Sequence, residues 1–100
     1  MECISRGTTQ EMTFALPEEI MIDALYITFA QGGETVLEKS YDDVSISGSV
    51  ITLPLSQEDT LRFRRGMVTV QVSVRDGAGN VMRDNANRFE VKDVLKNGVI

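Results

Sequence analysis

The chain has 100 residues, of which 42% are hydrophobic and 25% charged, and its formal net charge is −5. This size and balance are typical of one globular domain with its own hydrophobic core, so we expect residues 1–100 to form a single domain. A negatively charged chain is a poor ligand for nucleic acid, whose phosphates require a basic surface, and no apolar run is long enough to cross a membrane.

The absence of histidine excludes several kinds of active site. The chain contains no histidine and one cysteine, Cys3. Histidine is the commonest general base and a common metal ligand, so serine or cysteine hydrolase triads and ordinary zinc sites are not expected. Cys3 cannot form an internal disulfide; it is either a plain thiol or a partner in an intermolecular bond. We therefore predict that the protein is not an enzyme and uses no metal or other cofactor.

The amino-terminal half is expected to begin irregularly and then to form five strands. Residues 1–9 show neither alternation nor the apolar core of a signal peptide, so we expect an irregular lead-in and synthesis in the cytoplasm. Alternating apolar and polar residues then predict strands over residues 10–16, 24–30, 35–41, 44–46 and 50–55. The segment 17–23 fits either a short helical turn or an extended crossover.

The carboxyl-terminal half is organised around one strand. A serine N-cap and two acidic residues in the first turn predict a short helical turn over Ser56–Leu61. Four valines alternate with polar residues over Met67–Arg75, which predicts a central strand with one buried face. A turn over Asp76–Asn80 precedes a last strand over residues 81–91, interrupted at residues 85–87 by what we interpret as a bulge.

Taken together, these elements predict the fold class. About seven short strands separated by turns are typical of an all-β protein, an antiparallel β-sandwich. The helical turn before the sixth strand occupies the place it has in many immunoglobulin-like domains. Tryptophan and a second cysteine are absent, so the expected likeness to immunoglobulin domains concerns topology and not the disulfide-bonded core of antibodies.

The acidic residues indicate neither a metal site nor a catalytic one. A calcium-binding loop that begins at Asp76 would need glycine at its sixth position and glutamate at its twelfth, where the chain has Val81 and Asn87. The adjacent carboxylates Asp42-Asp43 and Glu58-Asp59 would point in different directions. Such pairs are usually solvated, or they cap a turn or helix.

The last eight residues, 93–100, form an unusually apolar tail. Its candidate interaction residues are Val94, Leu95, Val99 and Ile100. Exposed apolar side chains reduce solubility unless something covers them. They would therefore either fold back onto their own sandwich or dock on another chain by adding to its sheet edge.

The only basic cluster of the chain consists of Arg62, Arg64 and Arg65. On an acidic chain it would suit a carboxylate-bearing partner or an acidic patch of a neighbouring copy. The alternative, which we favour, is a solvated linker that Phe63 anchors to the core.

Five segments that together span nearly the whole chain show a familiar pattern: Ser5–Thr9, Met12–Pro17, Ala24–Gln31, Leu53–Leu61 and Val94–Ile100. In these segments the chain resembles a family of small, mostly uncharacterised phage and prophage proteins of Gram-positive bacteria. More distantly, the Thr-Phe-Ala-Leu stretch and the Tyr-Ile-Thr-Phe strand are similar to the amino-terminal, Ig-like domain of phage upper baseplate proteins. No receptor-binding or fibre domain follows here, which argues against direct host recognition.

The resemblance implies a non-enzymatic structural protein, used in tail or baseplate assembly through protein–protein contacts. Its partners would be other copies of itself, as a homo-oligomer, or other phage tail proteins, with no role for nucleic acid or membrane. It would be made in the bacterial cytoplasm and carried in the virion once assembled. The alternative is a small carbohydrate- or surface-binding module, which would use exposed aromatic residues such as Tyr26 and Tyr41.

Overall fold

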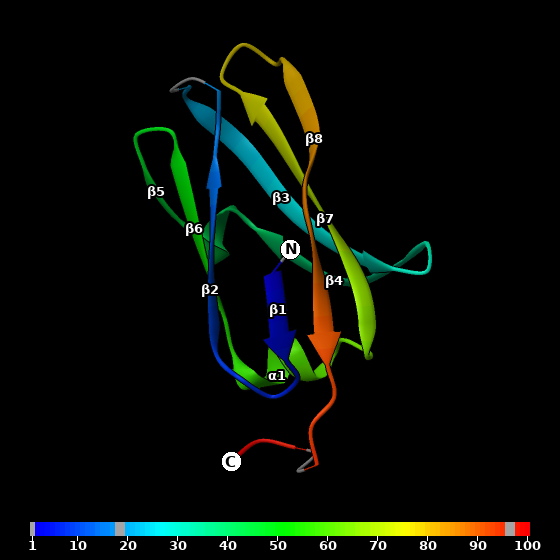
Figure 1. Cartoon of the computed structure of the whole chain (residues 1–100). Helices are drawn as coiled ribbons and strands as arrows, with labels where there is room; N and C mark the ends of the chain where they lie inside the picture. The colour runs from blue at the N-terminus through cyan, green and yellow to red at the C-terminus, as the bar shows by residue number, and fades with distance from the viewer. Residues whose placement is uncertain (1, 18–19, 96–97) are drawn as a thin grey trace.

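The structure is a computed structural model that describes residues 2–17, 20–95 and 98–100. The strands of the described chain are, in order, β1 (Glu2–Ser5), β2 (Gln10–Ala15), β3 (Ile22–Gln31), β4 (Glu34–Ser40), β5 (Ser45–Ser47), β6 (Val50–Leu55), β7 (Gly66–Asp76) and β8 (Val81–Lys92) (Figure 1). A 3-10 helix, η1 (Tyr41–Asp43), lies between β4 and β5. A single turn of α-helix, α1 (Gln57–Leu61), lies between β6 and β7.

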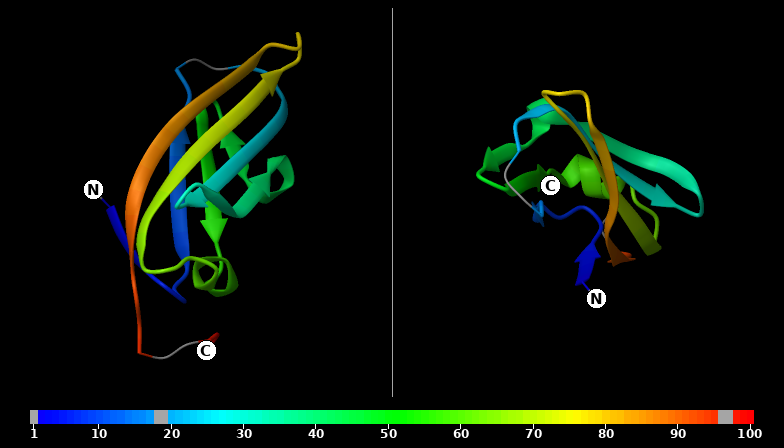
Figure 2. Two further views of the ribbon diagram at one scale, coloured as in Figure 1. Left: turned by 90° about the vertical axis from the view of Figure 1, so that its right-hand side faces the viewer. Right: turned by 90° about the horizontal axis from the view of Figure 1, so that it is seen from above.

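The strands form two sheets that pack face to face as a sandwich (Figure 1, Figure 2). The larger sheet has the order β1-β8-β7-β3-β4, and the smaller one has the order β2-β6-β5. Neighbouring strands are antiparallel except β1 and β8, which run parallel. The prediction of an all-β, antiparallel Ig-like sandwich with one helical turn before its central strand is therefore confirmed, and β1 is an additional strand.

The predicted central strand is β7, which pairs with β3 on one side and β8 on the other. Its four alternating valines are all buried against the second sheet, with 0–5% of their surface exposed: Val68, Val70, Val72 and Val74. The partner strand β3 follows the same alternation, because it pairs residue by residue with β7 and turns Leu25, Ile27 and Phe29 inward. The smaller sheet completes the core with Ile51, Leu53 and Leu55 of β6.

Three phenylalanines form an aromatic cluster in the core near α1. Phe63 lies in the linker between α1 and β7, while Phe29 belongs to β3 and Phe89 to β8. The ring centroids are 5.6 Å (Phe29–Phe63), 5.7 Å (Phe63–Phe89) and 6.3 Å (Phe29–Phe89) apart. The last two pairs meet edge to face, which is a favoured arrangement of aromatic rings. The linker is thus fixed to the core through one side chain.

The expectation of an irregular lead-in over residues 1–9 is wrong for Glu2–Ser5, which form β1. This strand pairs in parallel with the end of β8, and Ile4, opposite Val91, is buried in the core. Four residues with one buried apolar side chain are too short a pattern to be recognised by alternation. Their partner strand, β8, also lies far away in the sequence, so no turn between the two strands predicts the pairing.

The predicted bulge in the last strand is confirmed, and the strand continues through it. β8 runs from Val81 to Lys92 without a break. Along β7 the pairing advances two residues, from Val70 to Val72, while along β8 it advances three, from Asn87 to Asp84. One extra residue on one strand is the definition of a bulge.

The undecided segment 17–23 is only partly described, because Glu18 and Glu19 lie outside the described residues. Ile20 and Met21 belong to neither helix nor strand, and β3 already begins at Ile22. The described part of the segment therefore contains no helical turn and leads into an extended strand.

Truncation of the linker anchor should cost much of the stability of the fold. Replacing Phe63 with alanine removes a fully buried ring that contacts two others, so the free energy of unfolding should fall by about 3–5 kcal/mol. Urea unfolding followed by circular dichroism measures this change. The control is Met67→Ala, at a partly exposed position of β7, which should cost less than about 1 kcal/mol. Equal losses in the two variants would contradict the anchoring role.

Candidate functional site

The tail follows β8 at one end of the sandwich and turns back toward α1 (Figure 1). Its backbone is fixed at Ile100, whose N–H donates to the side-chain oxygen of Gln57 over 2.9 Å, while the Gln57 amide donates to the Ile100 carbonyl over 3.4 Å. The apolar side chains are not covered by this return. Leu95 is fully exposed, Ile100 is 88% exposed and Val99 is 51% exposed, and only Val94 is partly buried.

We call Leu95, Val99 and Ile100 the tail patch. Of the two expectations for the tail, folding back holds for the backbone at Ile100 but not for these side chains, which stay exposed. Residues 96–97 lie outside the described residues. Docking on a partner therefore stays a prediction, for which the patch supplies the apolar surface.

The first residue of the tail, Asp93, is held by Arg6, which the sequence analysis did not single out. Its guanidinium donates to the carbonyls of Phe63 (2.7 Å) and Leu61 (3.1 Å) and to the carboxylate of Asp93 (3.1 Å). The Arg6 backbone N–H also donates to the carbonyl of Lys92 over 3.0 Å. One side chain thereby joins the residues after β1, the end of α1 and the end of β8. Five fixed N–H donors make arginine suited to such a junction.

This arrangement lowers the pKa of Asp93. The N–H of Val94 donates to the carboxylate and lowers the pKa most, and the Arg6 hydrogen bond lowers it further. Loss of solvation opposes this effect, while the positive charges of Arg6 and Arg65 also lower the pKa. One member of the arginine cluster, Arg65, therefore lies close enough to Asp93 to lower its pKa.

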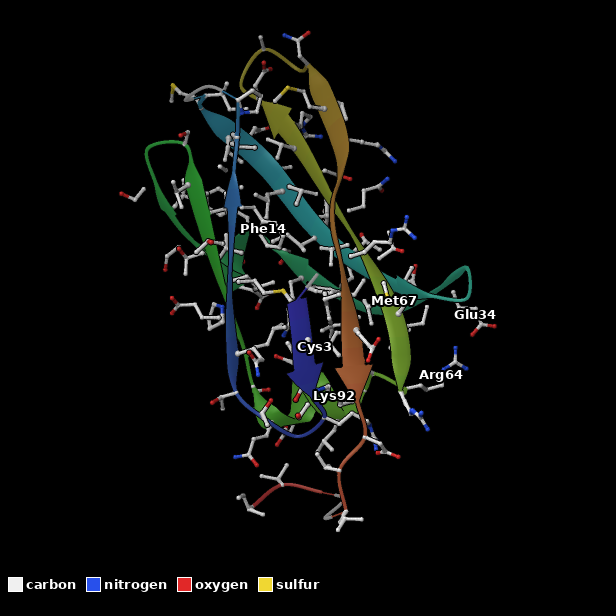
Figure 3. The ribbon with its side chains drawn as sticks, in the orientation of Figure 1. Cys3, Phe14, Glu34, Arg64, Met67 and Lys92 are labelled. Atoms are coloured by element: carbon white, nitrogen blue, oxygen red, sulfur yellow. The ribbon has the colours of Figure 1, made fainter. Side chains whose placement is uncertain are left out.

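The basic cluster lies on the surface between α1 and β7. Arg62, Arg64 and Arg65 are all exposed, and Phe63 between them is buried, as expected for a solvated linker anchored by Phe63. Figure 3 shows Arg64 pointing away from the sandwich, near Glu34 at the β3–β4 turn. A buried amide fixes the linker a second time: the Arg64 N–H donates to Gln31 Oε1 over 2.8 Å, and Gln31 Nε2 donates to the Arg64 carbonyl over 2.7 Å. Within the described chain the three guanidinium groups form no ion pair, so they are available to a partner.

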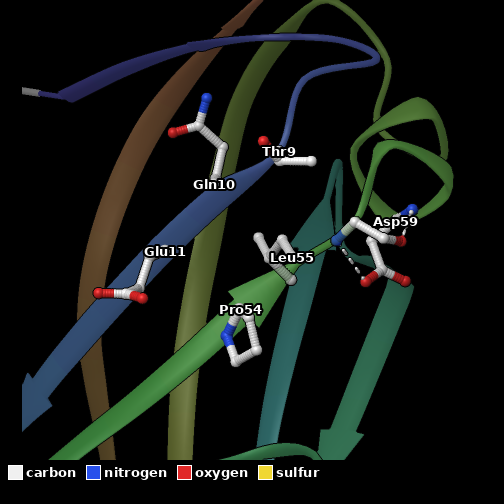
Figure 4. Close-up of a pocket in the computed structure, with 7 residues that line it drawn as sticks. Thr9, Gln10, Glu11, Pro54, Leu55 and Asp59 are labelled. Atoms are coloured by element: carbon white, nitrogen blue, oxygen red, sulfur yellow. Dashed lines mark hydrogen bonds between the residues drawn. The ribbon is translucent and has the colours of Figure 1, made fainter. Parts of the chain in front are cut away.

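A shallow hollow of about 540 Å³ lies where β2 and β6 meet the start of α1 (Figure 4). Its lining comprises Thr9, Gln10, Glu11, Pro54, Leu55, Ser56 and Asp59. Two of its polar residues have structural roles. Asp59 accepts from the Ser56 N–H over 3.0 Å and its own N–H donates to Ser56 Oγ over 3.1 Å, which forms the capping box of α1. Asp59 also pairs with Lys39 over 3.0 Å. The hollow gives no sign of converging catalytic groups.

The other acidic positions also have structural roles. Asp76 Oδ1 accepts from the backbone N–H groups of Ala78 and Asn80, which closes the β7–β8 turn. Asp43 accepts from the Ser40 N–H at the start of η1. Across residues 2–17, 20–95 and 98–100 no three metal-ligating side chains gather in one place.

A second group of exposed apolar residues, which the sequence analysis missed, lies at the opposite end. Met21, Val81 and Met82 are 86%, 56% and 39% exposed. The carbonyl of Met21 accepts from the Gly77 N–H over 3.1 Å, which places Met21 beside the β7–β8 turn. The adjacent pair Val81-Met82 could have indicated an exposed apolar residue, because two adjacent residues in a strand cannot both face the core.

The comparisons with known proteins concern the fold. CopC from Methylosinus trichosporium OB3b matches with a TM-score of 0.60 at 14% identity, over 96% of this chain and 86% of that one. The V domain of amphioxus IgVJ-C2 matches with a TM-score of 0.40 at 15% identity, over 93% of this chain and 99% of that one. No family model matches the chain, and no curated protein does. At this level of identity the likeness to CopC shows a shared β-sandwich fold alone.

Within the described residues, no helix has the length and apolar character that crossing a membrane requires. The one α-helix, Gln57–Leu61, has five residues and contains a serine-capped, acidic first turn. It serves instead to position Gln57 and the linker that follows.

The Arg6 junction should contribute measurably to stability. In an Arg6→Ala variant the carbonyls of Leu61 and Phe63 lose a charged donor at a partly buried position, so the free energy of unfolding should fall by about 1–3 kcal/mol. Arg6→Lys, which keeps the charge but not the planar fork of donors, should recover only part of the loss. The matched control Arg62→Ala removes an exposed arginine and should change stability by less than about 0.5 kcal/mol. If all three variants unfold at the same urea concentration as the parent protein, the junction is unimportant.

Stability should fall in acid, with Asp59 as one cause. Burial raises the pKa of Asp59, but hydrogen bonds from Ser56 and Lys39 and the charge of Lys39 outweigh it, so the pKa is lowered. A carboxyl whose pKa is lower in the folded state stabilises the fold above its unfolded pKa, and this is lost as the pH falls from about 5 to about 2. Thermal unfolding across this range should show a smaller loss for Asp59→Asn than for the parent. Asp42→Asn, an exposed control in η1, should follow the parent; equal slopes in all three proteins would exclude the Asp59 contribution.

Proposed function

We propose that this protein is a non-enzymatic structural protein of a phage or prophage and that it acts in tail or baseplate assembly through protein–protein contacts. The observation that carries the proposal is the tail patch: three aliphatic side chains that stay exposed although the segment bearing them is fixed at both ends. The sequence resemblance to small phage and prophage proteins supplies the biological setting.

The fixation of the tail supports a contact surface more than a loose end. Arg6 holds Asp93, and Gln57 holds Ile100 through two hydrogen bonds. A surface whose position is set before binding loses less conformational freedom when it binds. The exposed Arg65, whose charge acts on Asp93, adds a cation near the start of the tail.

The described residues also offer little to support catalysis. The chain lacks histidine, and the carboxylates Asp43, Asp59 and Asp76 are used to cap helices or close a turn. The hollow between β2, β6 and α1 is shallow, and one of its two acidic residues, Asp59, is paired with Lys39. We therefore infer a protein with no enzymatic activity, no metal and no other cofactor.

The partners follow from the same reasoning. They are copies of the chain itself or other phage tail proteins, and neither nucleic acid nor membrane is involved. The protein is made in the bacterial cytoplasm and becomes part of the virion on assembly.

A small carbohydrate- or surface-binding module is the second candidate, and one hollow favours it. On the outer face of the larger sheet a hollow of about 230 Å³ is lined by Tyr26, Thr28, Glu38, Gln71, Ser73 and Arg83. Tyr26 is about half exposed there, and an exposed aromatic ring among polar side chains is suited to a sugar. The hollow presents one tyrosine, since Tyr41 does not line it.

Particle composition tests the proposal directly. Phage particles purified from a host that expresses this chain should contain it in a fixed ratio to the major tail protein, as measured by quantitative mass spectrometry. A cytoplasmic protein of similar abundance serves as the contamination control. Absence of the chain from particles, together with oligosaccharide binding that Tyr26→Ala abolishes, would replace the structural role with the binding module.

A further inference from the structure

The turn between β7 and β8 begins with an aspartate that is followed directly by a glycine, Asp76-Gly77. In such a pair the backbone nitrogen of the glycine can attack the carboxyl carbon of the aspartate side chain, Cγ, because glycine has no side chain to hinder the approach. Asp76 is partly exposed and Gly77 is exposed, so water reaches both residues. The turn therefore carries the groups for a rearrangement of its own main chain, which needs neither an enzyme nor a cofactor.

The rearrangement has two steps, and its atoms balance. In the first step the Gly77 nitrogen bonds to Asp76 Cγ and gives up its proton, and the hydroxyl of the protonated carboxyl leaves with that proton as water. The product is a five-membered cyclic imide. In the second step water opens the ring: attack at Cγ restores aspartate, whereas attack at the other carbonyl carbon gives isoaspartate, in which the main chain runs through the former side chain.

The folded turn holds the carboxylate in place. Asp76 Oδ1 accepts from the backbone N–H groups of Asn80 and Ala78, each over 2.9 Å, and Oδ2 accepts from the Asn80 side-chain amide over 3.2 Å. The hydrogen bonds from Asn80 lower the pKa of Asp76 most, and those from Ala78 and Gly79 lower it further, against the opposing effect of desolvation. An ionised carboxylate lacks the proton with which its oxygen leaves as water, so these bonds disfavour the first step.

The folded turn also holds the attacking nitrogen. The Gly77 N–H donates to the carbonyl of Met21, the residue before β3, over 3.1 Å. The N–H of Asp76 itself donates to the carbonyl of Asn80 over 2.9 Å, which fixes the main chain on the other side of the reacting bond. For the nitrogen to reach Cγ, the side chain must leave its donors and Gly77 must leave Met21. The first step therefore requires the turn to open.

We propose that Asp76-Gly77 is a site of isoaspartate formation, which the closed β7–β8 turn keeps unreactive and which reacts when the turn opens. Isoaspartate adds one carbon atom to the main chain and attaches the carboxylate directly to Cα. The acceptor of the Ala78 and Asn80 donors is then displaced, so the modified turn no longer closes as before. One opening event can thus loosen this end of the β7–β8 hairpin permanently, whatever the wider function of the protein.

Incubation of the full chain, folded and unfolded, tests the protection. The folded protein and the same chain in guanidinium chloride are kept at one pH and temperature and then digested. Chromatography against synthetic aspartate and isoaspartate standards measures the rearrangement in the peptide that contains residue 76; Asn97-Gly98, a pair with a similar tendency, falls in another peptide. The folded protein should react at least about tenfold more slowly, as expected for a turn that is open one-tenth of the time or less.

Two variants separate the turn from the chemistry. Asn80→Ala removes the donor to Oδ2, so the folded variant should react about two- to tenfold faster than the folded parent, the range of one hydrogen bond, with the unfolded rate unchanged. Gly77→Ala should keep the turn, because the φ of Gly77 is not positive and an added Cβ meets no atom within 4 Å, yet it hinders the attack and should slow the unfolded chain. Arg62→Ala, at the opposite end of the molecule, is the matched control and should change neither rate (Figure 1).

Three results would overturn the inference. Absence of isoaspartate at residue 76 in the unfolded chain would exclude the site. Equal rates in the folded and unfolded chains would exclude protection by the turn. An Asn80→Ala variant that circular dichroism shows to be folded, and that reacts as slowly as the parent, would show that the hydrogen bonds of the carboxylate do not restrain the reaction.

Discussion

The guanidinium of Arg6 is the interaction on which the lower end of the molecule depends. Its donors reach the carbonyls of Leu61 and Phe63 and the carboxylate of Asp93, so one side chain connects three segments that are distant in sequence. The linker it holds carries Phe63 into the aromatic cluster, and the segment it holds leads into the tail patch. The start of the tail is therefore coupled to the core through a polar junction.

Most of the fold was predictable because two-residue alternation is a strong signal. The valines of β7, the strand β6 and the serine cap of α1 follow from local pattern alone. The strand β1 and the role of Arg6 were not predictable, because their partners are backbone groups more than fifty residues away and leave no mark in the neighbouring sequence. The tail patch was visible from composition. The exposure of Met21 was missed because this residue lies in a segment without clear periodicity.

One edge of the larger sheet is protected by charged side chains. The edge strand β4 carries Glu34, Glu38 and Lys39, and charged side chains on an edge discourage pairing with another chain. The outer face of the larger sheet is also mostly polar, with Thr28, Gln71 and Ser73 on adjacent strands. Pairing of another chain along β4 is thus disfavoured, whereas aliphatic side chains stay exposed at both ends of the molecule.

The parallel pairing of β1 with β8 has a mechanical consequence. The two strands run in the same direction over four residue pairs, from Glu2–Phe89 to Ser5–Lys92. If the chain were pulled at its amino-terminal side and at the segment after β8, the two strands would be drawn past each other along their length. The hydrogen bonds between them would then carry the load together, in shear, and would not open one at a time as in a hairpin pulled from its end. A subunit joined to neighbours through its tail would transmit tension through this pair of strands, which makes the short, easily overlooked β1 the clamp that resists unfolding under force.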